Sequence, residues 1–149
     1  MVAVTVLSMA IFGITAPFAI AAASQAEDAR RTLANALAQE MMEEILAKSH
    51  EAADAAATGP GRRVRAEFES IHEYAVLDEP AGRIEDAFGH VIRDPAATGL
   101  SRHTRVHNVS VGGQTSLETS FVRVDVELRY RGKHVLTVTR LVYCDSARE

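Results

Sequence analysis

The feature that most constrains this chain is the stretch from Met1 to Ala26, which contains no Asp, Glu, Lys, Arg or His. As a helix rising ~1.5 Å per residue, the part from Met1 to Ala23 spans roughly 35 Å, slightly more than the ~30 Å hydrocarbon core of a bilayer. Apolar residues occupy every face of this helix, and a chain of 149 residues leaves too little sequence to cover them. We therefore expect residues 1–26 to lie in a membrane or in a bundle of identical helices.

The large apolar residues of this stretch, with its proline, are the expected membrane and assembly contacts. They are Val2, Val4, Val6, Leu7, Met9, Ile11, Phe12, Ile14, Pro17, Phe18 and Ile20. Because Pro17 removes one backbone hydrogen bond, we expect a kink or local melting near Gly13–Pro17.

The helical pattern continues without a linker through residues 27–49, where strong helix formers dominate. Leu33, Leu37, Met41 and Ile45 recur every four residues, which is typical of the apolar stripe of an amphipathic helix. The water-facing side is expected to carry Arg31, Asn35, Gln39, Glu43 and Glu44. The sequence thus predicts one helix from Val2 to Ser49, about 72 Å long, whose second half packs this stripe against a head domain.

Residues 50–149 are expected to form that head, with a β-hairpin over about residues 121–144. From Phe121 to Tyr130 the even positions are apolar, while the odd positions from Arg123 to Arg129 are charged, which predicts a half-buried strand. Arg131-Gly132-Lys133 then reads as a three-residue hairpin loop. In that register the expected cross-strand pairs are Leu128 with Leu136, Val126 with Val138, Val122 with Val142 and Val124 with Arg140.

The remainder of the head gives weaker signals. Arg102–Val109 favours a third strand, whereas Asp78–Gly82 and Arg93–Pro95 are typical of turns. The basic cluster Arg62, Arg63 and Arg65 is too small to indicate nucleic-acid binding, and we expect it to be a solvated loop. The fold class expected is α+β, with the long helix packed on a small antiparallel sheet.

No group of residues points to catalysis. His103 and His107 are four residues apart, but in a strand that spacing separates them by about 13 Å, so we expect no metal site. The adjacent acids Glu43-Glu44 and Asp78-Glu79 do not converge as catalytic carboxylates must. The single cysteine, Cys144, cannot form a disulfide within the chain. We expect no catalytic residue, no cofactor and no metal.

The sequence from Met1 to Ile11, MVAVTVLSMAI, resembles the stretch that follows the start of the mature chain in the type IV pilin and type II secretion pseudopilin superfamily. Pro17 falls where helices of that family often carry a proline, and Ala34–Ile45 is similar to the corresponding helix segment of minor pilin-like proteins. The resemblance implies a structural subunit of a pilus or pseudopilus, held by one span in the inner membrane with its head extracytoplasmic. It also implies assembly with other pilin-like subunits into a filament.

Family members begin with a basic leader that ends in Gly, followed by Phe and, shortly after, Glu, and this part of the pattern has no counterpart in the chain. The expectation is that these residues lie upstream of Met1. Only in that case is prepilin peptidase a partner.

Two alternatives remain open. The first is a secreted or periplasmic binding module behind an ordinary signal peptide, because Ser24 and Ala26 offer small residues for cleavage before Glu27. The second is a single-span envelope protein with no role in a filament. The position of the mature N-terminus and crosslinks between neighbouring helices separate these alternatives.

Overall fold

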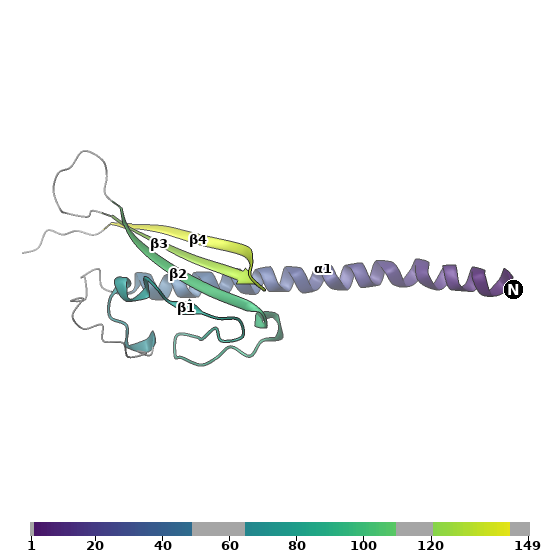
Figure 1. Ribbon diagram of the computed structural model, residues 1–149, viewed down its shortest axis with the longest axis horizontal. Helices are drawn as coiled ribbons and strands as arrows, with labels where there is room; N and C mark the ends of the chain where they lie inside the picture. The colour runs from purple at the N-terminus through teal and green to yellow at the C-terminus, as the bar shows by residue number, and fades with distance from the viewer. Residues whose placement is uncertain (1, 49–64, 110–120, 144–149) are drawn as a thin grey trace, which may run out of the picture.

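The computed structural model describes residues 2–48, 65–109 and 121–143, and the side chains of residues 2–17, 19 and 66 lie outside that description. One long helix, α1 (Val2–Leu46, 45 residues), comes first in the chain and extends well beyond the head (Figure 1). At ~1.5 Å per residue it is about 67 Å long. The helix ends three residues before the predicted Ser49.

The helix is continuous through Pro17, and Figure 1 shows one uninterrupted ribbon there. Of the kink or local melting predicted near Gly13–Pro17, the local melting is therefore wrong. Proline removes a single hydrogen-bond donor, and the backbone hydrogen bonds of the turns on either side keep the chain helical.

The head contains an antiparallel sheet of four strands in the order β1-β2-β3-β4. The strands are β1 (Asp78–Glu79), β2 (Leu100–Val109), β3 (Phe121–Tyr130) and β4 (Lys133–Tyr143). Three short 3-10 helices, η2 (Arg65–Glu67), η3 (Ile71–Tyr74) and η4 (Pro95–Ala97), complete the described head. The second half of α1 packs against β3 and β4, which gives the predicted α+β layout (Figure 1).

The register of the β3–β4 hairpin is as predicted, although its turn is not. The observed pairs include Leu128 with Leu136, Val126 with Val138, Val124 with Arg140 and Val122 with Val142. The turn has two residues rather than three, because Lys133 already pairs with Tyr130, and Arg131 and Gly132 both have positive φ (49° and 79°). The register shifts between Leu128 and Arg129, where β4 contains one extra residue. This extra residue offsets the shorter turn, so the pairs from Leu128 back to Val122 are the expected ones.

The segment before β2 differs from its prediction at one point. Asp78 and Glu79 form strand β1 rather than a turn, pairing with His103 and Arg102. The turn comes directly afterwards, where the Arg83 N–H donates to the Pro80 carbonyl at 3.0 Å, two residues later than expected.

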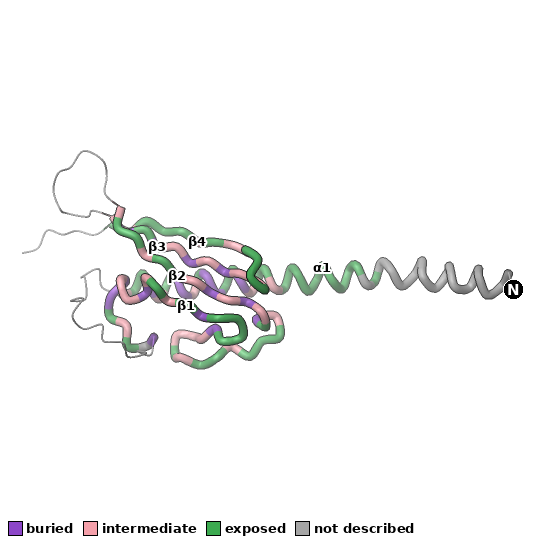
Figure 2. Tube along the Cα trace, in the orientation of Figure 1, coloured by how far each residue is buried: buried purple, intermediate pink, exposed green. Residues whose placement is uncertain are grey.

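The core lies between α1 and the inner face of the sheet, and Figure 2 shows that buried residues gather there. From the helix it contains Ala34, Leu37, Ala38, Met41, Met42 and Ile45. Facing them are Ile71, Tyr74, Ile84, Leu100, Val122, Val124, Val126 and Leu128. Leu33 is partly buried at the margin of this cluster.

Candidate functional site

The first candidate site is the part of α1 that the head does not cover. Residues 20–29 are exposed on all sides, and Figure 2 shows this part of the helix standing clear of the head. Phe18 is 73% exposed and Ile20 is 72% exposed. The nine other predicted membrane contacts, from Val2 to Pro17, have side chains outside the described residues. Within the part of the chain that the structure describes, no helix is long and apolar enough to cross a membrane.

Two apolar stripes lie on different faces of α1. The covered stripe consists of Leu33, Ala34, Leu37, Ala38, Met41, Met42 and Ile45, and it packs on the head. The uncovered stripe lies nearer the N-terminus, on a face of the helix turned away from the covered one, and consists of Phe18, Ala21, Ala22, Gln25, Ala26 and Ala29. All six residues of the uncovered stripe are exposed, so this surface has no partner within the described chain.

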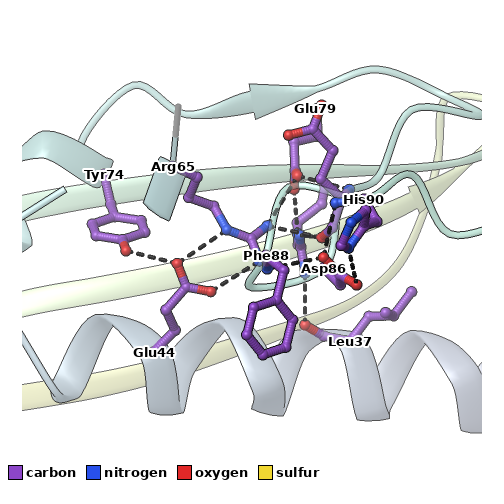
Figure 3. Close-up of polar contacts among 10 residues, drawn as sticks. Leu37, Glu44, Arg65, Tyr74, Glu79, Asp86, Phe88 and His90 are labelled. Atoms are coloured by element: carbon purple, nitrogen blue, oxygen red, sulfur yellow. Dashed lines mark hydrogen bonds and ion pairs between the residues drawn. The ribbon is translucent and has the colours of Figure 1, made fainter. Parts of the chain in front are cut away.

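The second candidate site is an ionic layer buried between α1 and the head, made of Arg65, Arg102, Glu44 and Glu79 with Tyr74 (Figure 3). The Arg102 side chain is 0% exposed, and its Nε donates to Glu79. Its two other nitrogens donate to the carbonyl of Leu37 on α1 at 3.1 Å and to that of Glu85 at 2.8 Å. A single guanidinium thus joins the helix, strand β1 and the loop after it.

Arg65 makes the matching contacts on the other side of the layer. Its Nη1 donates to Glu79 Oε1 at 3.1 Å and to the Glu85 carbonyl at 2.9 Å, and its Nε donates to Glu44 Oε1 at 3.0 Å. Arg65 Nη2 also lies 2.9 Å from Glu44 Oε2, although this contact lacks hydrogen-bond geometry. Tyr74 donates its hydroxyl hydrogen to Glu44 Oε1 at 2.7 Å.

The charges of the layer balance, since two guanidinium groups face two carboxylates. Burial is the main reason that the pKa of Tyr74 is raised well above its usual value, and the hydrogen bond to Glu44 adds to this. The Arg65 side chain is 2% exposed and that of Glu79 is 8% exposed, so neither is open to a substrate. These ion pairs and hydrogen bonds hold α1 and the head in one relative position.

The loop Glu85–Val91 projects from this layer and carries Phe88, which is 80% exposed. Asp86 Oδ1 accepts hydrogen bonds from the backbone N–H groups of Phe88 (2.9 Å) and His90 (2.8 Å). The Asp86 N–H donates to the His90 carbonyl at 2.9 Å, and Gly89 closes the turn with φ 83°. The two hydrogen bonds that the Asp86 carboxylate accepts, from the His90 N–H first and from the Phe88 N–H second, lower the pKa of Asp86.

The outer face of the sheet is polar. A groove of about 460 Å³ on it is lined by His103, Arg105, Arg123, Asp125, Glu127, Thr137 and Thr139. Its acids already have partners, because Asp125 pairs with Arg123 at 2.9 Å and Glu127 pairs with Arg129 at 2.8 Å.

The two histidines of the metal hypothesis, His103 and His107, both lie on β2 and on this outer face. His103 Nδ1 lies 2.8 Å from Asp78 Oδ1, whereas His107 is opposite Arg123. Among the described residues there is no group of three or more His, Cys, Asp or Glu side chains that could hold a metal ion.

The sequence prediction missed the ionic layer. Arg65 was expected in a solvated loop and Glu44 on the water-facing side of the helix, and both predictions are wrong. Only Arg102 could have been recognised as buried from its local sequence. It alternates with Leu100 and Thr104 and therefore shares the inner face of β2. Arg62 and Arg63 lie outside the described residues.

No protein-family model matches this chain, and neither does any curated protein or any solved structure. The function proposed below therefore depends on the sequence and the geometry described above.

Proposed function

We propose that this chain is a pilin-like structural subunit, held in the inner membrane by the first half of α1. Through the same helix it assembles with other pilin-like subunits, in a type IV pilus or a type II secretion pseudopilus. The observation that carries the proposal is that the head covers the second half of α1, whereas nothing in the described chain covers the exposed apolar residues from Phe18 to Ala29.

The uncovered part favours assembly or insertion because exposed apolar surface is costly in water. Burying one side chain such as Phe18 or Ile20 stabilises an assembly by about 1.5–3 kcal/mol. The charge-free sequence from Met1 to Ala26 extends the same property to the N-terminus. Lipid or neighbouring helices can bury this surface, whereas the chain's own head lies too far along α1 (Figure 2).

The ionic layer supports a structural role for a different reason. Arg102 and Arg65 tie the head to α1 through Leu37 and Glu44, so any movement of the helix is transmitted to the head. A subunit that assembles through its helix needs such a connection, since the helix position then fixes the position of every head.

Membrane insertion is tested by flotation of the full chain with phospholipid vesicles. We expect the natural chain to float and a Phe18→Asp/Ile20→Asp variant to float poorly, because a charge in the hydrocarbon core is costly. Asn35→Asp is the matched control, since it adds a negative charge at an exposed position of the head-covered half. Recovery of the natural chain in the vesicle-free fraction would contradict the proposal.

Assembly is tested with a photocrosslinking residue, p-benzoylphenylalanine, at position 18 of the membrane-bound chain. We expect crosslinked dimers and larger species, and none from the same residue at Val76, which is 88% exposed on the head. Membrane binding without crosslinks would instead favour the single-span envelope protein. A mature N-terminus at Glu27, read by mass spectrometry from the native cell, would favour the secreted module.

A further inference from the structure

We propose that a basic cluster at one end of the head binds the phosphate groups of anionic phospholipids at the membrane surface. The cluster consists of Arg30, Arg31, Arg131 and Lys133, which lie around Tyr130. This inference depends on the proposed function, because insertion of α1 is what brings these residues to the lipid. It adds that the head itself contacts the membrane and recognises one class of lipid.

Tyr130 joins the helix and the sheet in this cluster. The guanidinium carbon of Arg30 on α1 lies 3.7 Å from the centre of the Tyr130 ring, and that of Arg131 lies 5.3 Å from it. Both are cation–π contacts. Lys133 pairs with Tyr130 across the two-residue turn. Figure 1 shows this turn at the end of the head from which the N-terminal part of α1 emerges, so the cations gather on the side of the membrane.

The turn that carries Arg131 is fixed in position. Its N–H donates to the Gly99 carbonyl at 2.8 Å. A Cβ atom at Gly99 would lie 2.9 Å from the Tyr130 ring, so the backbone there fits closely against the ring. Arg131 has φ 49°, a conformation in which Gly, Asn and Asp are preferred to arginine. Backbone strain of this kind is most common at functional positions.

The cations of the turn have no acidic partner of their own. Arg131 and Lys133 are exposed, and neither forms an ion pair within residues 2–48, 65–109 and 121–143. A phosphate group supplies the missing negative charge, and its oxygens accept paired N–H groups from a guanidinium. These two side chains are therefore open to a phosphate ligand.

Acidic residues near the cluster offset only part of its charge. Glu27 pairs with Arg30 at 2.6 Å and with Arg31 at 3.3 Å, so two arginines share one carboxylate. Asp28 precedes Arg30 by two residues, which places it about 160° around the helix axis, away from the hairpin. Four cations thus face two carboxylates, and the end of the head remains positive.

The position of the cluster along α1 matches the depth of the lipid headgroups. The charge-free sequence ends at Ala26, and Arg30 and Arg31 follow about 6–8 Å further along the helix axis. The headgroup layer of a bilayer is about 5–8 Å deep on each side of the hydrocarbon core. Arg131 contacts the same ring as Arg30, so it reaches this layer as well. Tyrosine, here Tyr130, is itself enriched at this depth.

Anionic lipids are the headgroups that this charge selects. Each basic residue close to an anionic membrane strengthens the attraction about fivefold, whereas a zwitterionic surface has no net charge to attract it. Binding at the hairpin end would hold the head of an unassembled subunit in one orientation on the membrane.

The test uses the full chain in vesicles of equal phosphatidylglycerol and phosphatidylcholine. A photocrosslinking residue, p-benzoylphenylalanine, replaces His134, which is exposed and adjacent to Lys133, and mass spectrometry identifies the lipid adducts. We expect phosphatidylglycerol adducts to exceed phosphatidylcholine adducts about fivefold, the contribution of one net charge. Tyr143 is the control position, because it is 60% exposed but about 30 Å further along β4, and it should give no lipid adduct.

Substitutions test whether the cluster causes the preference. Arg131→Gln/Lys133→Gln should bring the adduct ratio close to one, since the two remaining arginines are balanced by two acids, whereas Arg131→Lys should preserve it. Arg105→Gln/Arg123→Gln is the matched control, because it removes two exposed cations from the outer face of the sheet and should leave the ratio unchanged. Salt at about 1 M, where the Debye length is about 3 Å, should also lower the ratio.

The outcomes separate this inference from the proposed function. A chain that does not float with the vesicles would overturn both. A chain that floats but gives no lipid adduct from position 134, or gives adducts of the two lipids equally, would overturn the inference and leave the membrane span intact. An undiminished ratio in Arg131→Gln/Lys133→Gln would also overturn it, because the preference would then come from another part of the chain.

Discussion

The covered and the uncovered stripe belong to one helix but have opposite surroundings. The covered stripe, from Leu33 to Ile45, is buried beneath β3 and β4, whereas the uncovered stripe, from Phe18 to Ala29, is exposed. Composition does not explain the difference, since both stripes are mostly apolar. The comparison teaches that the extent of the head along α1 decides where the chain buries its own surface and where it needs a partner. Substitutions in the covered stripe should therefore change stability, and those in the uncovered stripe should change association.

The largest effect on stability is expected in the ionic layer above the covered stripe. Glu79→Ala leaves Arg65 and Arg102 buried without their shared carboxylate and should lower the free energy of unfolding by about 3–5 kcal/mol. Urea denaturation of the full chain in detergent measures this change. Glu67→Ala is the matched control, because Glu67 is exposed. Equal effects of the two substitutions would show that the layer does not stabilise the head on the helix.

A cavity beneath the sheet should have a comparable or slightly smaller effect. Met41 is 0% exposed, so Met41→Ala should lower the free energy of unfolding by about 2–5 kcal/mol. Gln39→Ala changes an exposed residue of the same helix and should have almost no effect. The same urea titration compares them. A loss below about 1 kcal/mol for Met41→Ala would mean that the covered stripe is not firmly packed.

The hydrogen bond from Tyr74 to Glu44 should contribute less and should depend on pH. Tyr74→Phe is expected to cost about 1–2 kcal/mol at neutral pH. Because the folded state raises the pKa of Tyr74, its contribution is complete below the unfolded value of about 10 and is lost as the pH rises above it. The free energy of unfolding should therefore fall more steeply at alkaline pH in the natural chain than in Tyr74→Phe.

This pH measurement has a matched control and an outcome that would contradict the prediction. Tyr143 is 60% exposed, so Tyr143→Phe should keep the natural alkaline slope. If Tyr74→Phe and Tyr143→Phe have the same slope, the hydroxyl of Tyr74 is not held protonated by the fold.

The smallest effect on stability is expected in the uncovered stripe. Phe18→Ala should change the free energy of unfolding by no more than about 0.5 kcal/mol, because Phe18 is 73% exposed. Leu37→Ala, in the covered stripe, is the contrasting variant and should cost about 2–5 kcal/mol. Similar losses in the two variants would remove the distinction between the two parts of the helix.

The regular elements were the most predictable part of the fold. Alternation from Phe121 to Tyr130 correctly predicted the strand and its pairing, because period-two burial allows only one register to place every valine inside. The turn was predicted one residue too long. The register was still correct, because one extra residue in β4 offsets the shorter Arg131–Gly132 turn.

The polar contacts of the candidate site were not predictable in the same way. Arg65 is 21 residues from Glu44 and 14 from Glu79, while Arg102 reaches the carbonyl of Leu37 across 65 residues. No local pattern distinguishes an arginine with such partners from a solvated one. Their separation along the chain is why a basic cluster was interpreted as a surface loop.

The sequence by itself determined the long helix, its apolar stripe and the strands of the hairpin. Each follows from the spacing of apolar residues along a short segment, which local backbone geometry converts directly into a buried face. Only the tertiary structure decided that the head covers α1 no further than Arg30, that two arginines and two glutamates lie buried in a layer against α1, and that Phe88 projects from the loop Glu85–Val91. These features depend on contacts between distant segments, whose burial and charge balance exist only once the chain has folded.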